Sequence, residues 1–168
     1  MDFIIRIALL VILIPAMSYG GDQHPDHGNE NAGGVEALSD GLRDLLSREM
    51  YALQSGMKSI IPAYNSGDWG EIETIARKMK DSYILKQSLT ESQVTELHSL
   101  LPPAFIKEDQ KFHYLAGMLE HVAKNKKVEL INFYFSEMNE SCVNCHALYA
   151  THKFPALSPG ETKGEHEH

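Results

Sequence analysis

Four long stretches of the chain carry apolar residues at steps of three and four positions. The first begins near Ser39 or Asp40, and Asn65-Ser66-Gly67 interrupts it. Its apolar positions are Leu38, Leu42, Leu45, Leu46, Met50, Leu53, Met57, Ile60, Ile61 and Tyr64. Because an α-helix turns once in about 3.6 residues, this spacing places the apolar side chains on one side of a helix. The pattern therefore predicts a long amphipathic helix that ends before Gly67.

A capping sequence opens the second stretch. In Asp68-Trp69-Gly70-Glu71, the carboxylate of Asp68 can accept from the first free amides of a helix, and Glu71 can reach back to the cap. The apolar positions of this stretch are Trp69, Ile72, Ile75, Ala76, Met79 and Tyr83. They predict a second helix that includes Tyr83.

The segment from Ser88 to Pro103 is less regular. It ends in Leu100-Leu101-Pro102-Pro103, which cannot lie inside a helix, and we expect only a short helical turn around Glu91–Leu97.

A third helix is predicted through Phe105, Phe112, Leu115, Met118, Leu119 and Val122, closing near Lys124-Asn125-Lys126. A fourth is predicted through Val128, Ile131, Phe135, Met138, Cys142, Leu148 and Tyr149, ending before Pro155.

Strand-like alternation of apolar and polar residues is absent at useful length. Four amphipathic helices with mostly short connections predict an all-α fold, an antiparallel four-helix bundle over residues 35–154. Residues 21–34 are rich in Gly, Asp, Asn and His, which predicts a flexible linker. The polar residues that close the chain predict a disordered tail over 155–168.

The first twenty residues have the pattern of an export signal. Arg6 stands in a short leading region, the apolar run Ile7–Ile14 follows, and Ala16, Ser18 and Gly20 supply small residues for cleavage. The apolar run is too short to span a bilayer, so we expect no membrane span after cleavage. A first core helix is the alternative. The pattern favours a signal peptide over residues 1–20 and a working compartment outside the cytoplasm.

Composition and charge narrow the range of partners. At 168 residues the chain suits one ordinary domain, and 43% of its residues are hydrophobic. It has 23 acidic and 15 basic residues, a formal net charge of −8, and no basic run. Since nucleic-acid binding requires clustered Lys and Arg, a nucleic-acid partner is excluded, whereas a basic redox or protein partner suits the acidic surface.

Both cysteines of the chain lie in one short motif, Cys142-Val143-Asn144-Cys145-His146. This is the attachment sequence of a c-type haem. Residues three apart share one side of a helix, so both thiols can reach the two vinyl groups on one porphyrin edge and form thioethers. His146 then supplies the proximal ligand of the iron. The motif predicts one covalently attached haem c.

Three other interpretations of the cysteine pair compete with haem attachment. A thioredoxin-like pair is typical of a βαβ setting, and the sequence predicts no strands. A zinc site would use Cys142, Cys145, His146 and His152, but adjacent Cys and His ligands suit a tetrahedral site poorly. A structural disulfide between Cys142 and Cys145 would close almost no loop and would stabilise little.

With this motif in its last helix, the chain resembles the class II c-type cytochromes, which include cytochrome c-prime. The resemblance covers Ser39 to His152 and rests on the helix count, the place of the motif, the spacing of Arg43, Met50 and Met57, and Tyr149 after the haem histidine. It implies a four-helix bundle and a bacterial periplasmic location. It also implies that a homodimer through the first two helices is an option.

One position departs from the family pattern. Family members usually follow the tyrosine with a basic residue, whereas this chain has Ala150. The resemblance then leaves neutralisation of the haem propionates to other residues, for which Arg48, Arg43 and Lys153 are the candidates.

The sixth position of the iron decides the function that the resemblance implies. Met50 falls where low-spin members have their methionine ligand, with Met57 as the second candidate, although methionines on an apolar stripe are often core packing. A lone His98, His113 or His121 is a weaker candidate. We expect a periplasmic monohaem electron carrier between redox proteins and no enzyme. The alternative is a five-coordinate haem protein that binds nitric oxide or carbon monoxide.

Overall fold

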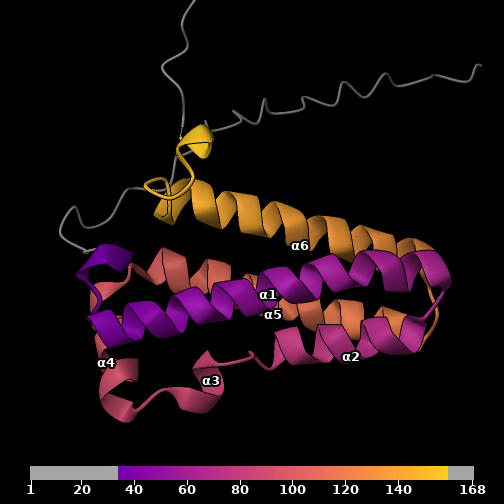
Figure 1. Cartoon of the computed structure of the whole chain (residues 1–168), viewed down its shortest axis with the longest axis horizontal. Coiled ribbons are helices and arrows are strands. Elements are labelled where there is room, and N and C mark those ends of the chain that lie inside the picture. The colour runs from indigo at the N-terminus through magenta and orange to yellow at the C-terminus, as the bar shows by residue number, and fades with distance from the viewer. Residues whose placement is uncertain (1–33, 159–168) are drawn as a thin grey trace, which may run out of the picture. The chain divides into compact units, whose positions relative to one another are not determined.

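Every regular element of the structure, a computed structural model that describes residues 34–158, is a helix (Figure 1). The elements are the 3-10 helix η1 (Val35–Ala37), α1 (Asp40–Ser66), α2 (Trp69–Lys80), α3 (Leu85–Ser88), α4 (Glu91–Leu100), α5 (Pro103–Lys124), α6 (Val128–Tyr149) and the 3-10 helix η2 (Pro155–Leu157). The prediction of an all-α fold is confirmed. Two helices, α3 and α4, stand between the second and third helices of the sequence prediction.

Several sequence predictions fall outside the described residues. These are the signal peptide over 1–20, the linker except for Gly34, and the tail from 159 onward. At the start of the segment predicted as a tail, Pro155–Leu157 form η2. None of the helices between residues 34 and 158 combines the length and the apolar character that crossing a bilayer requires.

The turn between α1 and α2 follows directly from its sequence. Gly67 ends α1 in the left-handed conformation, with φ of 72°, and its N–H donates to the carbonyls of Ala63 and Tyr64. Glycine adopts this conformation without a Cβ penalty, so it suits the end of a helix. One residue later, the Asp68 carboxylate accepts from the Glu71 amide at 3.0 Å and caps α2 as predicted. The expected return contact of Glu71 is not formed, because the Asp68 amide donates to the carbonyl of Ala63 at 2.9 Å. The two helices therefore fold back on one another.

A glycine allows α1 and α2 to approach closely. A Cβ on Gly56 would lie 2.5 Å from Cε of Met79, 2.7 Å from Oη of Tyr83 and 3.4 Å from Cγ2 of Ile75. Since real Cβ atoms do not come as close as 2.7 Å to other heavy atoms, a larger side chain here requires the ends of the Met79 and Tyr83 side chains to move. This contact fixes which side of α1 faces α2.

A buried carboxylate ends α2 earlier than the sequence suggested. Glu49 of α1 is only 1% exposed and accepts from the hydroxyl of Ser82 at 2.9 Å. It also accepts from the backbone amides of Tyr83, Ile84 and Leu85, at 2.9, 2.6 and 3.2 Å. The prediction that the second helix includes Tyr83 is therefore wrong: α2 ends at Lys80, and the next amides turn to Glu49.

The connection to α5 contains a second capped helix. Thr90 and Gln93 form a reciprocal capping box at the start of α4, so the expected turn at 91–97 is a helix of ten residues. Pro103 is the first residue of α5, where its missing N–H costs nothing.

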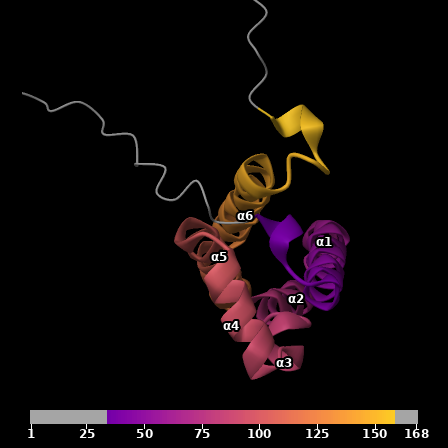
Figure 2. The same ribbon diagram turned by 90° about the vertical axis from the view of Figure 1, so that its left-hand side faces the viewer.

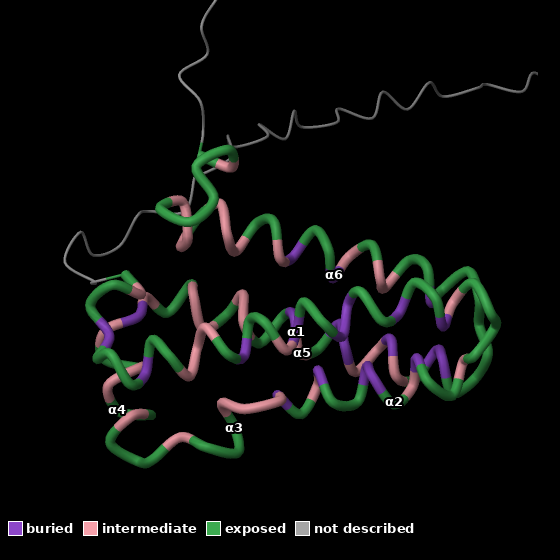
Figure 3. Tube along the Cα trace, in the orientation of Figure 1, coloured by how far each residue is buried: buried purple, intermediate pink, exposed green. Residues whose placement is uncertain are grey.

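The main core lies among the four long helices. Figure 3 shows the buried positions of α1, α2, α5 and α6 turned toward one another. The fully buried side chains of this core include Ile60, Ile72, Met79, Leu119, Ile131 and Met138. A smaller cluster around Leu38, Leu42 and Leu101 joins η1, α1 and the α4–α5 connection.

The four long helices are not packed equally tightly. The close pairs are α2 with α5, α5 with α6, and α1 with α2, whereas α1 and α6 approach one another less closely. Viewed along the helices, α1 and α6 lie on separate sides of the arrangement (Figure 2). The candidate site residues lie on α1 and α6.

Candidate functional site

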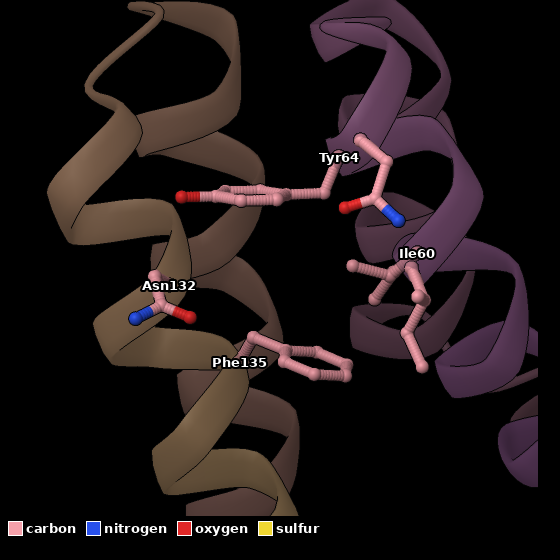
Figure 4. Close-up of a pocket in the computed structure, with 6 residues that line it drawn as sticks. Ile60, Tyr64, Asn132 and Phe135 are labelled. Atoms are coloured by element: carbon pink, nitrogen blue, oxygen red, sulfur yellow. The ribbon is translucent and has the colours of Figure 1, made fainter.

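A cavity shows which faces of α1 and α6 are turned toward one another. It has a volume of about 190 Å³ and is lined by Ile60, Ile61, Tyr64, Asn65, Asn132 and Phe135. Figure 4 shows Ile60 and Tyr64 on α1 opposite Asn132 and Phe135 on α6. The two helices run in opposite directions (Figure 1). The cavity residues Tyr64 and Asn132 therefore mark positions on α1 and α6 that lie opposite one another, from which other positions along the two helices can be compared.

Met50 and His146 lie at similar distances along their helices from this pair of opposite residues. Met50 precedes Tyr64 by as many residues as His146 follows Asn132, about four helical turns in each case, or about 20 Å. Because whole turns return to the same side of a helix, Met50 lies on the side of α1 that faces α6, and His146 lies on the side of α6 that faces α1. Helical periodicity thus places the backbone positions of two sequence-predicted ligands at a similar level of α1 and α6.

The side chain of Met50 is 37% exposed, whereas that of Met57 is 8% exposed and belongs to the main core. Met57, the second candidate for the sixth ligand, thus packs against the other helices. Met50 lies on the rim of the α1–α6 side, where its thioether is free of the core.

The other histidines named as ligand candidates lie elsewhere. His98 and His121 are exposed on α4 and α5. Nδ1 of His113 lies 2.7 Å from the carbonyl of Met79, and Nε2 lies 3.5 Å from a carboxylate oxygen of Asp109. Although burial lowers it, the hydrogen bond and charge of Asp109 and the Met79 carbonyl raise the pKa of His113 above its ordinary value. His113 therefore joins α5 to the end of α2.

The two cysteines are half-buried free thiols on α6, and Cys142 packs against the main core. Burial raises the pKa of Cys142. Burial, together with the negative charges of Asp109, Cys142 and Glu108, raises the pKa of Cys145 to about 11. A thiol–disulfide exchange centre requires a thiol with a lowered pKa, so these thiols are poor candidates for that chemistry.

His146 is held in the form that a metal ligand needs. Burial lowers its pKa, which favours the neutral imidazole near pH 7. Its ring is stacked on that of Phe154, with 4.3 Å between the ring centroids and 14° between the planes. Tyr149, one turn further along α6, meets Phe105 of α5 edge to face at 5.2 Å.

The segment after α6 folds back toward the start of the described chain. Nδ1 of His152 lies 2.7 Å from a carboxylate oxygen of Glu36 in η1. Within residues 34–158 no three His, Cys, Asp or Glu side chains are gathered closely enough to hold a metal ion. The four ligands of the zinc alternative are therefore not assembled in this structure, and His152 pairs with Glu36.

The candidates for propionate neutralisation lie at the same end of the fold as the end of α6. Arg43 pairs with Asp40 and donates to the backbone carbonyl of Glu36 at 2.8 Å. Arg48 lies 3.6 Å from the carboxylate of Asp44, and Lys153 is exposed in the segment after α6. Arg43 and Arg48 thus already have carboxylate partners on α1.

Two residues that position the site were not predicted from the sequence. Glu49 lies within the apolar stripe of the first helix, and a carboxylate at a core position was a signal of a buried polar contact. Phe154 follows the helix that carries the motif, and its stacking depends on a reversal of the chain that no local pattern announces.

No family model, no curated protein and no solved structure matches the chain. The functional argument therefore rests on the motif, the helix order and the geometry given above.

Proposed function

We propose that this protein is a monohaem c-type cytochrome that transfers single electrons between redox partner proteins in the periplasm. Cys142 and Cys145 would hold one haem c through thioethers, and His146 would be the proximal iron ligand. Met50 is the candidate sixth ligand. The proposal rests on the Cys-x-x-Cys-His motif on α6, with Met50 expected from helical periodicity at the level of His146 on the antiparallel helix α1.

The chemistry of the donor set fits such a group. Two protonated, half-buried thiols lie three residues apart on α6, a spacing that matches attachment to two vinyl groups. The half-buried imidazole of His146 has a lowered pKa, which favours the neutral form in which a histidine binds iron. When bound, a haem supplies a one-electron iron couple whose potential depends on its axial ligands.

The arrangement of the long helices supports an antiparallel four-helix bundle as the frame of the site. The tight packing of α2 with α5, and of α5 with α6, forms a rigid side of the fold. We infer from helical periodicity that His146 and Met50 lie at one level on the looser α1–α6 side. We propose that a haem lies on this side, with α1 supplying the distal contacts.

Met50 decides between two functions within this proposal. A thioether favours ferrous iron, so His146 with Met50 would raise the reduction potential and suit an electron carrier. The partial exposure of Met50 favours the second candidate, a five-coordinate protein whose open distal position takes nitric oxide or carbon monoxide.

The negative charge around the motif supports a basic redox partner. Asp109 and Glu108 of α5 lie close enough to Cys145 to raise the pKa of its thiol. Complementary charge speeds the encounter of transient partners and makes it dependent on salt. We propose that the protein acts as a carrier with no catalytic residues of its own.

Optical spectra of the protein, matured in a periplasm with a haem-attachment system, distinguish the electron carrier from the gas-binding protein. Low-spin bands that do not change on addition of carbon monoxide to the reduced protein support the electron carrier. High-spin bands that shift with carbon monoxide support gas binding. Replacing both cysteines with alanine is the control, because it removes covalent attachment and leaves the other haem-facing residues in place.

A further inference from the structure

The segment after α6 turns back on the helix that it leaves. The amides of Lys153 and Phe154 both donate to the carbonyl of Ala150, at 2.9 and 3.0 Å, and η2 packs against α6. The turn lays the Phe154 ring on the His146 ring, with the two planes only 14° from parallel. Nδ1 of His152, 2.7 Å from a carboxylate oxygen of Glu36, links the same segment to η1.

The stacking on Phe154 limits the orientation of this imidazole. Among residues 34–158, the His146 ring makes no hydrogen bond, whereas a metal-bound histidine usually donates its second N–H to a carboxylate or carbonyl. Rotation of the ring about its Cβ–Cγ bond would bring it into the Phe154 ring. The stacking therefore orients the imidazole ring, as a hydrogen bond to its second nitrogen does at other metal sites.

The stacking is compatible with binding of a metal. The lone pair through which an imidazole nitrogen binds iron lies in the plane of the ring, and Phe154 covers a face. The phenyl ring thus limits rotation and keeps water from one face without competing for the nitrogen. The contact between His152 and Glu36 helps to hold the Phe154 ring against the His146 ring.

We infer that Phe154 is a positioning residue for His146, which sets the plane of the proximal imidazole and keeps water from it. This inference rests on the proposed function. Water near the proximal ligand stabilises the more positive ferric state, so loss of the phenyl ring should lower the reduction potential. An aromatic replacement should preserve it.

The experiment measures haem attachment and then the reduction potential of the holoprotein in Phe154→Ala, Phe154→Tyr and Phe133→Ala. Phe133 is the matched control, because it is a phenylalanine on α6 that is 51% exposed and contacts Tyr134. We expect a lower potential in Phe154→Ala and wild-type potentials in Phe154→Tyr and Phe133→Ala. If Phe154→Ala fails to retain haem, Phe154→Leu is measured in its place and should shift in the same direction.

The outcomes separate this inference from the proposed function. Wild-type protein without covalent haem overturns the proposed function and this inference with it. Haem attached in every variant with one common potential overturns the role of Phe154 alone. An equal shift in Phe133→Ala would also overturn it, since the effect would then follow from loss of any aromatic residue on this helix.

Discussion

Replacing Glu49 with alanine removes the acceptor that holds α1 to the connection between α2 and α3. Its carboxylate accepts from the Ser82 hydroxyl and from the amides of Tyr83, Ile84 and Leu85. Truncation leaves all four donors without this partner. Ser82 is 2% exposed, so water reaches its hydroxyl poorly, whereas the three amides lie in half-buried residues and can be partly rehydrated.

The magnitude follows from the number of buried donors. An unsatisfied buried donor costs about 1–3 kcal/mol, and this change leaves only neutral donors, with no unpaired charge. Because three of the donors are partly rehydrated, we expect Glu49→Ala to lower the free energy of unfolding by about 3–4 kcal/mol. Glu49→Gln keeps one acceptor oxygen and should lose about half as much.

Urea denaturation followed by circular dichroism measures both variants. Glu140→Ala, a Glu-to-Ala change at an exposed position of α6, is the control and should stay within about 0.5 kcal/mol of the wild type. A loss below about 1 kcal/mol in Glu49→Ala would refute the reasoning, because four hydrogen bonds to a buried carboxylate would then contribute almost nothing.

Glu49 also bears on the proposed site. It precedes Met50, and its contact with the α2–α3 connection fixes the rotation of α1 about its axis. That rotation also sets the side of α1 on which Met50 lies. In holoprotein, Glu49→Ala should therefore weaken the low-spin spectrum as well as the fold.

Further predictions concern packing, pH and ligation. Gly56→Ala should cost about 1–3 kcal/mol on denaturation because its Cβ meets Met79, while Gly41→Ala, with nothing within 4 Å, should not destabilise. His113 has a raised pKa, so its stabilisation is present below its unfolded pKa of about 6.5 and is lost as pH rises through the folded value. The stability difference from His113→Gln should shrink correspondingly as pH rises above about 6.5. In holoprotein, Met50→Ala should convert a low-spin to a high-spin spectrum and lower the potential; an unchanged spectrum would indicate another ligand.

The long helices were predictable because their apolar stripes are long and regular. The short α3 and α4 contain no buried residue, so periodicity carries little signal there. The early end of α2 depends on Glu49, more than thirty residues earlier in the chain, and on Ser82 with a φ of 62°. Such a contact between distant residues cannot be derived from local spacing.

The sequence predicts which residues form the candidate site, but it does not predict how they are arranged in space. Cys142, Cys145 and His146 follow from one motif. The shared level of Met50 and His146 required the facing positions of α1 and α6, and the stacking of Phe154 required the chain reversal at Ala150. These features depend on how helices pair in space, which a one-dimensional pattern leaves open.

Intact mass spectrometry of denatured protein, matured in a periplasm with a haem-attachment system, tests the central claim most directly. We predict a species heavier than the mature polypeptide by one haem, with the added mass lost when Cys142 and Cys145 are both replaced by alanine. A bare polypeptide, with both thiols free or joined to each other, would contradict the account.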